Sequence, residues 1–501
     1  MHEPHACMHD ERSFNTATLS LRAKPSARRQ MPTMLATAAM EGNLDEVKRL
    51  LAHGPEEQLS DGNALMFATG AGRAACVEAL LAHVPEEQVR AVDANGDTAL
   101  IIAADRGHVA CVEALLAHVP EEQVRATNAD GDTALKFASR PCTDPDLAKR
   151  LLTTMRRVVC VKRLLAHVPE EQVRAVDEDS NTALMFACDG HMEPRIQPMI
   201  ALRVECVKAL LAHVPEEQVR ATNADGDTAL MFAAGQGHVE CVRLLLAHVP
   251  EEQVRAVDAN GDTALICAAA EGHVACVEAL LEHVPEEQVR ETNGPGDTAL
   301  MCAANAGHVA CVEALLEHVL PEEQVRAAND NGYTALMFAV GAGHVACMEA
   351  LLERVPEEQV RAVDYYPGGT ALIHAATEGH VDCVRLLLAH VPEEQVRVTN
   401  DDGKTALICA AHRGHVECIE ALLMANSPLP EYGPVTIISS VLRDLRVCTT
   451  CRKGREDLGT KLQTCSACTP SGCDHWRYCG KECQAKDWRR HKKLCGVVFE
   501  E

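Results

Sequence analysis

The chain has 501 residues and is acidic, with 73 Asp or Glu against 47 Lys or Arg and a net charge of −26. This charge is uneven, because residues 443–501 hold 13 Lys or Arg against 8 Asp or Glu, which leaves −31 on residues 1–442. An array this acidic repels a phosphate backbone, which argues against nucleic acid as the principal partner. No stretch approaches the roughly 18 consecutive apolar residues of a membrane span, which argues against a membrane partner.

The first 32 residues are polar and lack the apolar core of a signal peptide. Their basic residues lie among Ser and Thr, as in transit peptides, but the acidic Glu3, Asp10 and Glu11 count against that function. We therefore predict a disordered leader over residues 1–32. We also expect an intracellular protein, cytoplasmic or nuclear.

The long middle of the chain is an internal repeat. Its tripeptide Thr-Ala-Leu recurs every 35 or 36 residues, apart from two longer steps of 49 and 46 residues. A degenerate copy, Asn-Ala-Leu, begins at Asn63. The tripeptide itself begins at Thr98, Thr133, Thr182, Thr228, Thr263, Thr298, Thr334, Thr370 and Thr405.

Each repeat predicts a turn followed by two helices. In one unit, Asn95-Gly96 is a turn signal, Thr98 is a candidate helix N-cap, and Gly107 is placed to end the first helix in the left-handed conformation. The second helix has apolar residues at helical spacing, namely Val109, Val112, Leu115 and Leu116. Pro120 then opens an acidic turn.

A turn plus two antiparallel helices, with Thr-Ala-Leu near the start and Gly-His between the helices, resembles the ankyrin repeat. The resemblance covers residues 33–426, in about eleven units, and implies a mostly α fold, a helical solenoid. In this sequence Ala replaces the family's Pro after Thr, and Met, Ile or Lys commonly replaces its His after Leu. These departures leave the fold intact and alter the loop face.

Two consecutive units are longer than the others, and their insertions fall between the first and second helix, near residues 140–156 and 189–203. Stacking places both insertions on one edge. The first insertion is basic, with Arg140, Lys149, Arg150, Arg156 and Arg157 running into Lys162 and Arg163, against Asp144 and Asp146. Two interpretations stay open: a tolerated loop insertion, or a docking ridge for an acidic partner.

Cysteine and histidine each recur at one position of the repeat. Stacked helices lie about 8–10 Å apart, beyond the roughly 7 Å between Cα atoms that a disulfide tolerates, so the cysteines are predicted to be buried apolar residues. The histidines are predicted to hydrogen-bond backbone rather than bind metal. The cysteines are Cys76, Cys111, Cys160, Cys206, Cys241, Cys276, Cys311, Cys347, Cys383 and Cys418. The histidines are His108, His238, His273, His308, His344, His380 and His415.

The C-terminal region holds four close pairs of metal ligands. Eight ligands are the number that closes two tetrahedral zinc sites. A Cys-x2-Cys pair lets two thiolates reach one ion from a tight turn, and a His-x3-Cys pair places both ligands on one face of a helix. The pairs are Cys448/Cys451, Cys465/Cys468, Cys479/Cys483 and His491/Cys495.

The residues among these ligands, from Tyr478 to Gln484 and then Asp487-Trp488, resemble the MYND zinc finger. The resemblance implies a small cross-braced module over residues 446–497 that folds around two zinc ions. Residues 427–445 are then a linker and short helix, and residues 498–501 a tail. By resemblance, one zinc is held by Cys448, Cys451, Cys479 and Cys483, and the other by Cys465, Cys468, His491 and Cys495.

One departure from the MYND pattern concerns the spacer between Cys468 and Cys479, which is longer than the family usually allows. It contains Cys473 and His475, so that either residue stays open as a replacement for Cys468. We favour Cys468, because Cys-x2-Cys is the better attested geometry.

Binding is the function that these features favour. Four protein ligands per zinc are typical of structural sites, and no catalytic motif stands in a supporting context, so we expect neither an enzyme nor a small-molecule substrate. MYND fingers bind short proline-containing peptides, and by resemblance Gln484 and Trp488 would line that groove, unless Trp488 is core. We expect a protein-interaction adaptor or scaffold. The alternative is a docking component of a ubiquitin-ligase or other protein-modifying complex.

Overall fold

The computed structural model describes most of the repeat region and two short strands. The described residues are 33–53, 63–83, 89–118, 124–167, 173–190, 197–213, 219–248, 254–283, 288–318, 327–354, 360–365, 368–390, 395–425, 463–464 and 477–478. They are mostly helical, which confirms the predicted fold class for this part of the chain. The predicted leader (1–32), linker with its short helix (427–445) and tail (498–501) lie outside the described residues.

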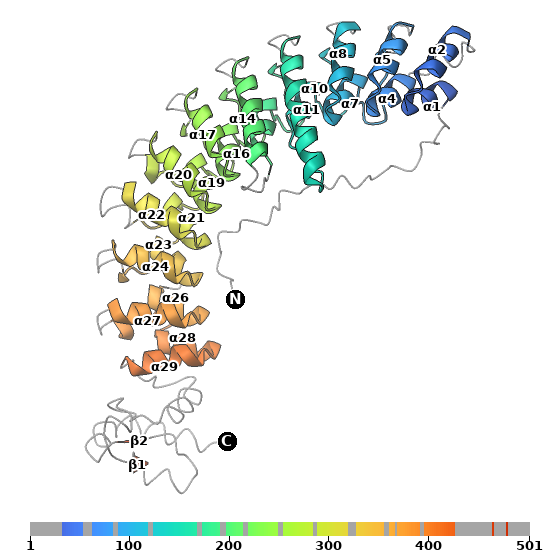
Figure 1. The fold of residues 1–501 in the computed structure, drawn as a ribbon. Helices are drawn as coiled ribbons and strands as arrows, with labels where there is room; N and C mark the ends of the chain where they lie inside the picture. Colours follow the sequence, from blue (N-terminus) through green and yellow to red (C-terminus); the bar gives the residue numbers. More distant parts are fainter. Residues whose placement is uncertain are drawn as a thin grey trace. The chain divides into compact units, whose positions relative to one another are not determined.

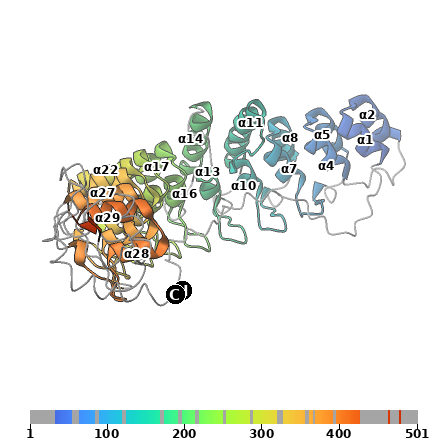
Figure 2. The same cartoon turned by 90° about the horizontal axis from the view of Figure 1, so that it is seen from below.

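The chain divides into two compact units, Met1–Gln288 and Val289–Glu501. In the first unit, helices alternate between two layers, and each contacts its counterpart in the next pair (Figures 1 and 2). The first-layer helices are α1 (Met34–Glu41), α4 (Asn63–Gly70), α7 (Ala99–Arg106), α10 (Ala134–Ser139), α13 (Ala183–Cys188), α16 (Ala229–Gly235) and α19 (Ala264–Ala270). The second-layer helices are α2 (Leu44–His53), α5 (Ala74–Leu81), α8 (Val109–His118), α11 (Leu147–Leu165), α14 (Gln197–Leu211), α17 (Val239–Leu246) and α20 (Val274–Leu281).

The second unit repeats this arrangement. Its first-layer helices are α21 (Ala299–Ala306), α23 (Ala335–Gly341), α26 (Ala371–Glu378) and α28 (Ala406–Arg413). Its second-layer helices are α22 (Val309–His318), α24 (Val345–Leu352), α27 (Val381–His390) and α29 (Val416–Met424). Single turns of 3-10 helix are η1 (Gln288–Arg290) and η2 (Gln395–Arg397), and two strands, β1 (Gln463–Thr464) and β2 (Arg477–Tyr478), pair antiparallel.

The start and end signals of the repeat act as the sequence predicts. The Thr98 hydroxyl caps α7 by accepting from the backbone N–H of Ile101 at 3.3 Å. The helix ends at Gly107, whose φ of 68° lies in the left-handed region that favours glycine. Because the hydroxyl and the glycine satisfy free backbone groups at opposite ends, a first helix of about two turns is stable within the stack.

The cysteine ladder is buried, as predicted. Its members are at most 5% exposed, and all are free thiols. Burial raises the pKa of Cys111 to about 11 and of Cys160 to about 12. The ladder therefore consists of neutral thiols that pack as small apolar side chains between neighbouring second-layer helices.

The histidine ladder joins six of the helix pairs to the pair before each of them. A ring Nε2 lies 2.9–3.3 Å from a backbone carbonyl oxygen of the preceding unit at His108, His238, His273, His344, His380 and His415. Because a carbonyl oxygen only accepts, Nε2 carries the proton in each bond. The prediction of a structural, backbone-bonded histidine is thus confirmed at these positions.

The same histidine explains why a glycine ends the preceding first helix. A Cβ atom added to Gly379 would lie 2.5 Å from Nδ1 of His415, closer than any real Cβ contact. Gly414 occupies the same position in the last pair and also has a positive φ, 80°, yet an added Cβ there meets nothing within 4 Å. Comparing Gly379 with Gly414 therefore separates the cost of a side chain at positive φ from the cost of its contact with the histidine ring.

We predict that Gly379→Ala destabilises the protein more than Gly414→Ala. Both variants hold an L residue in the left-handed region, at roughly 1–2 kcal/mol. Gly379→Ala also overpacks the His415 ring, which adds about 1–3 kcal/mol. Urea denaturation followed by circular dichroism measures both effects.

His415→Ala in the Gly379→Ala background supplies the control, because removing the ring should recover the overpacking part of the loss. Equal destabilisation by the two glycine variants would show that the histidine ring does not restrict this position.

Candidate functional site

The predicted zinc ligands lie outside the described residues, as do Gln484 and Trp488. The described part of this region is the ribbon of β1 and β2, in which Gln463 pairs with Tyr478 and Thr464 with Arg477. Among the residues that the structure describes, no group of three or more His, Cys, Asp or Glu is placed to hold a metal ion. The described repeats thus supply no metal site of that size.

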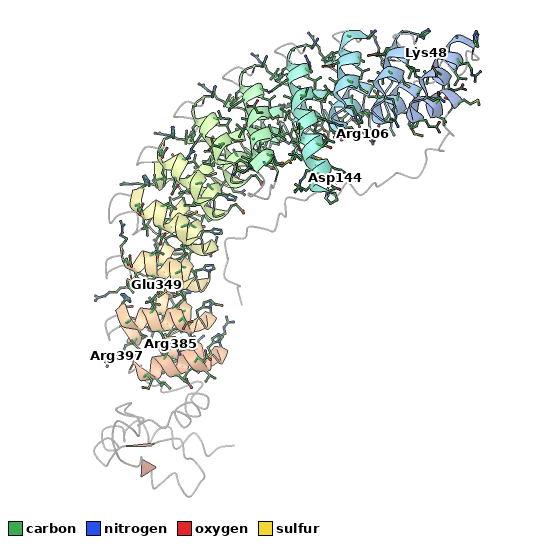
Figure 3. The ribbon with its side chains drawn as sticks, in the orientation of Figure 1. Lys48, Arg106, Asp144, Glu349, Arg385 and Arg397 are labelled. Atoms are coloured by element: carbon green, nitrogen blue, oxygen red, sulfur yellow. The ribbon has the colours of Figure 1, made fainter. Side chains whose placement is uncertain are left out.

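Both insertions contribute extra helical turns within the described residues. The ladder cysteine shows how many helical residues precede it in each second-layer helix. It is the third residue of the regular helix α8 (Cys111), but the fourteenth of α11 (Cys160) and the tenth of α14 (Cys206). The additional turns therefore extend α11 and α14 at their N-terminal ends. The N-terminal end of α11 projects past its neighbours, with Asp144 at its tip (Figures 1 and 3).

Arginine replaces histidine at the inter-unit position of three pairs. Counting three residues back from the ladder cysteine gives His108 in a regular unit but Arg73, Arg157 and Arg203 elsewhere. Arg73 Nε donates to the carbonyl oxygen of Met40 at 3.3 Å, a bond to the preceding pair like those of the histidines. Sequence reasoning that followed Gly-His missed these arginines, although counting from the cysteine would have found them.

Arg157 anchors the extended helix to the preceding pair. It is 9% exposed, its Nε donates to the carbonyl oxygen of Asp105 at 2.5 Å, and its terminal Nη2 lies 2.6 Å from the Asp105 carboxylate. Nη1 donates to the carbonyl oxygens of Arg140 and Pro141 at 3.0 and 3.3 Å. This arginine is therefore a structural residue that holds α11 in place, and not part of an open basic ridge.

Arg203 holds the second insertion in a different way. It is 8% exposed and donates to the carbonyl oxygens of Ala187, Asp189 and Gly190, at the end of the first helix of its own pair. Its Nε is buried and has no hydrogen-bond partner among the described residues. Burial accordingly lowers the pKa of the Arg203 guanidinium from its ordinary value.

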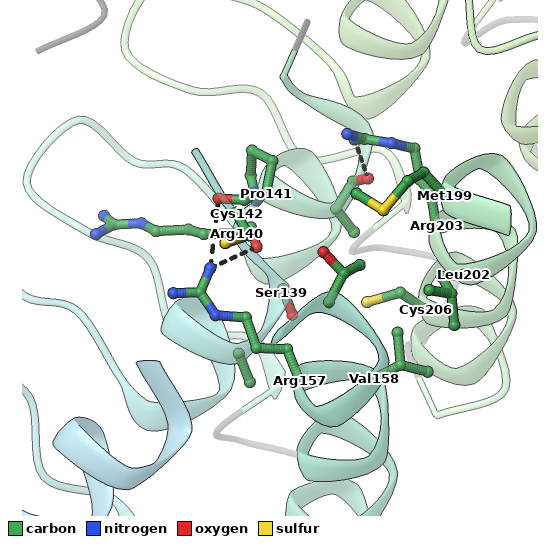
Figure 4. Close-up of a pocket in the computed structure, with 13 residues that line it drawn as sticks. Ser139, Arg140, Pro141, Cys142, Arg157, Val158, Met199, Leu202, Arg203 and Cys206 are labelled. Carbon is green, nitrogen blue, oxygen red and sulfur yellow. Dashed lines mark hydrogen bonds between the residues drawn. The ribbon is translucent and has the colours of Figure 1, made fainter. Parts of the chain in front are cut away.

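A narrow pocket of about 30 Å³ lies between the two insertions (Figure 4). The pocket is lined by Ser139, Val158, Met199, Leu202 and Cys206. The guanidinium groups of Arg157 and Arg203 extend away from its centre (Figure 4). That volume holds one or two water molecules and no organic ligand. Burial raises the pKa of the Cys206 thiol to about 12, which keeps this potential nucleophile protonated.

A buried charged cluster lies beside this pocket. Lys136 is 1% exposed at a position where the other pairs from α4 onward place Ile or Met, and its Nζ lies 3.6 Å from the Asp132 carboxylate. Arg140 also pairs with Asp132, at 2.7 Å, and its guanidinium lies 4.5 and 4.6 Å from the ring centroids of Phe137 and Phe186. Burial lowers the pKa of Lys136 and raises that of Asp132, so both charges are costly to hold here.

A second polar pair lies in the second unit. His374 Nε2 is 2.6 Å from the Asp364 carboxylate, which also accepts from the backbone N–H groups of Gly368 and Gly369. Burial acts to raise the pKa of Asp364, but the hydrogen bond from His374 and those from the backbone outweigh it and lower that pKa. The carboxylate thus organises a turn that is one residue longer than usual.

Comparison with known families identifies both parts of the chain. Ankyrin repeats match residues 83–157, 199–292, 284–364 and 357–429, which is more than half of the chain. The MYND finger family matches residues 448–495. The fold and the C-terminal site define a repeat protein with an appended zinc-binding module. The chain belongs to the ankyrin-repeat family and carries a MYND zinc finger at its C-terminal end.

Similarity to curated proteins is confined to a short segment. Protein CBFA2T2 of Mus musculus and its Homo sapiens counterpart are each 64% identical to this chain over 28 residues. The match covers 6% of this chain and 5% of each relative.

Ankyrin repeats and MYND fingers are protein-interaction modules, and the finger binds zinc. Within the described residues, no helix is both long and apolar enough to cross a membrane.

We predict that Lys136→Met leaves the free energy of unfolding unchanged or raises it by about 1–4 kcal/mol. A methionine fills the volume without a charge to desolvate, and Arg140 still pairs with Asp132. The free energy of unfolding, from urea titration, measures the change.

Asp132→Ala is the matching control for this cluster, because it leaves the Lys136 charge buried without its carboxylate. We expect it to cost about 3–5 kcal/mol. A loss of stability in Lys136→Met as large as that in Asp132→Ala would show that the lysine is favourable where it lies.

Proposed function

We propose that this protein is a zinc-dependent adaptor that acts by binding rather than catalysis. In this proposal the ankyrin repeats contact one protein, and the MYND finger captures a short proline-containing peptide of another. The observation that carries the proposal is the extent of the finger match, which begins at Cys448 and ends at Cys495. Those two residues are the first and last of the eight proposed zinc ligands.

The set of donor atoms fits zinc. Seven thiolates and one imidazole make two four-ligand sites of the kind that structural zinc prefers. Two such sites would contribute folding free energy to a module of about 50 residues, which buries too little apolar surface to fold alone. Zinc bound in this way supplies structure, and no coordination position is left open for substrate.

The strand pair supports the interleaved distribution of ligands. In sequence, Cys465 follows directly after β1 and Cys479 directly after β2. Because β1 and β2 are antiparallel, their carboxyl ends lie at opposite ends of the ribbon. This direction of the chain favours ligation of different zinc ions by Cys465 and Cys479, as the proposed assignment requires.

We predict that native mass spectrometry of the full chain finds two zinc ions. Cys468→Ser should lose one of them, whereas Cys473→Ser should keep both. Chelation should remove both ions and leave the helical circular dichroism of the repeats, because each repeat is stabilised by its neighbours. A single zinc in the wild-type chain contradicts the eight-ligand assignment, and loss of zinc from Cys473→Ser alone reassigns the ligand.

We predict that Trp488→Ala abolishes capture of a labelled proline-containing peptide and that Gln484→Ala weakens it. The indole is the proposed hydrophobic anchor, and the amide contributes a hydrogen bond of about 0.5–1.5 kcal/mol net. Fluorescence anisotropy with a panel of such peptides measures the affinity.

The zinc content of both finger variants must stay at two for this comparison. If Trp488→Ala releases metal, the indole belongs to the core of the finger and the groove assignment is wrong. A ubiquitin-transfer assay with the full chain tests the alternative role as a docking component of a modifying complex, since an adaptor of the proposed kind adds no transfer activity of its own.

A further inference from the structure

The extended helix α11 has an exposed apolar face. Leu152, Met155 and Val159 are 46%, 49% and 41% exposed. Their spacing of three and four residues places them in one stripe along the helix. The buried residues Arg157, Val161 and Leu164 lie on the opposite face. The apolar stripe therefore points away from the pairs that α11 stabilises.

Two ion pairs fix the position of α11 relative to the neighbouring second-layer helices and show that the stripe extends beyond α8. Arg163 pairs with Glu113 of α8 at 2.8 Å, and Lys162 pairs with Glu205 of α14 at 2.9 Å. Because α8 begins at Val109, only four residues before its partner glutamate, the part of α11 that precedes Val159 has no α8 turn beside it. Leu152 and Met155 lie on this projecting part.

Unpaired positive charge borders the stripe. Lys149 and Arg156 are exposed, and each lies three or four residues from Leu152, on the same side of the helix. Within the described ranges, neither side chain has a hydrogen bond or an ion pair. Four other bases of the insertion, Arg140, Arg157, Lys162 and Arg163, each pair with a carboxylate. Arg150 is only half-buried, and its Nε has no hydrogen-bond partner among the described residues.

The nearby acidic side chains are already used to start the helix. Asp146 caps α11 by accepting from the backbone N–H groups of Ala148 and Lys149 at 2.9 and 3.1 Å. Asp144 accepts from the N–H of Asp146 at 2.8 Å. These contacts hold both carboxylates at the helix end. The border of the stripe thus remains basic within a strongly acidic chain.

We propose that the α11 stripe, defined as Leu152, Met155 and Val159 with Lys149 and Arg156, docks an acidic amphipathic helix of a partner protein. From Leu152 to Val159 the stripe spans about 10 Å, which matches two turns of a partner helix with apolar residues at positions i, i+3 or i+4, and i+7. Acidic residues beside those positions would meet Lys149 and Arg156. This choice of partner rests on charge complementarity.

A second copy of the chain fits the stripe less well. Pairing two α11 stripes would place Lys149 and Arg156 of both copies along one seam, with four positive charges and no carboxylate among them. Like charges at an interface oppose association. An acidic helix removes this repulsion, and it also distinguishes the proposed partner from the peptide that the finger is proposed to capture.

The test measures binding of two synthetic helical probes to the full chain by fluorescence anisotropy. Both are lactam-stapled peptides with leucines at i, i+4 and i+7, one with Glu and the other with Lys at the remaining positions. We expect the acidic probe to bind at least about tenfold more tightly than the basic probe, with an affinity that falls as salt rises. Equal binding of the two probes, or no binding of the acidic one, overturns the proposal.

Variants then locate the site. Leu152→Gln combined with Met155→Gln should weaken the acidic probe at least about tenfold, and Arg156→Glu about fivefold. Two matched controls should stay within about twofold: Val257→Gln, at an apolar residue that is 48% exposed elsewhere, and Lys48→Glu, at an exposed lysine of α2 (Figure 3). Circular dichroism checks that each variant is folded.

Other results would assign the surface differently. Loss of probe binding in Trp488→Ala, with α11 intact, would move the interaction to the finger and overturn the proposal. A wild-type dimer in analytical ultracentrifugation that the Leu152→Gln and Met155→Gln variant dissociates would make the stripe an interface between copies. Failure of the proposed finger function leaves this test unaffected, because the probe contains no proline.

Discussion

Within each compact unit, the contact between one helix pair and the next is the interaction on which the described repeats depend. The first helices are about two turns long, too short to be stable by themselves, and a histidine or arginine of the following pair holds the ends of most of those described. His415 illustrates the contact: its Nε2 donates to the carbonyl oxygen of Thr377 at 2.9 Å, and its ring covers Gly379. The glycine is needed both for its positive φ and for the space that the ring occupies.

This constraint explains how the insertions are accommodated. Added residues extend α11 and α14 at their N-terminal ends, upstream of the ladder cysteines, so the buried contacts between second-layer helices keep their register. In the two extended pairs, an arginine occupies the position of the histidine, three residues before the ladder cysteine. Arg157 reaches back to Asp105 of the preceding pair, whereas Arg203 binds the end of its own first helix. A longer side chain with five donors replaces a shorter ring with one.

The cost of this solution is a concentration of buried charge in one part of the first unit. Lys136, Asp132, Arg157 and Arg203 are all at most 9% exposed, and the Nε of Arg203 has no partner within the described residues. The same region exposes the apolar stripe of α11. Exposed apolar residues beside a local departure from the repeat pattern are typical of interaction sites, which agrees with the docking proposed for α11.

The sequence by itself determined the repeat, the caps, the buried cysteine ladder and the backbone-bonded histidines, because these depend on local spacing that recurs many times. It also predicted the zinc finger, which its family match confirms, from ligand pairs that are close in the chain. Only the tertiary structure decided that the described parts of the insertions add helical turns to α11 and α14, and that most of the bases described there are internally paired. Arg157 is a buried anchor and Arg156 a free charge because of the carboxylates and carbonyl groups that neighbouring helix pairs place near them. Those partners are distant in the sequence, so the residues around Arg156 and Arg157 do not predict the difference.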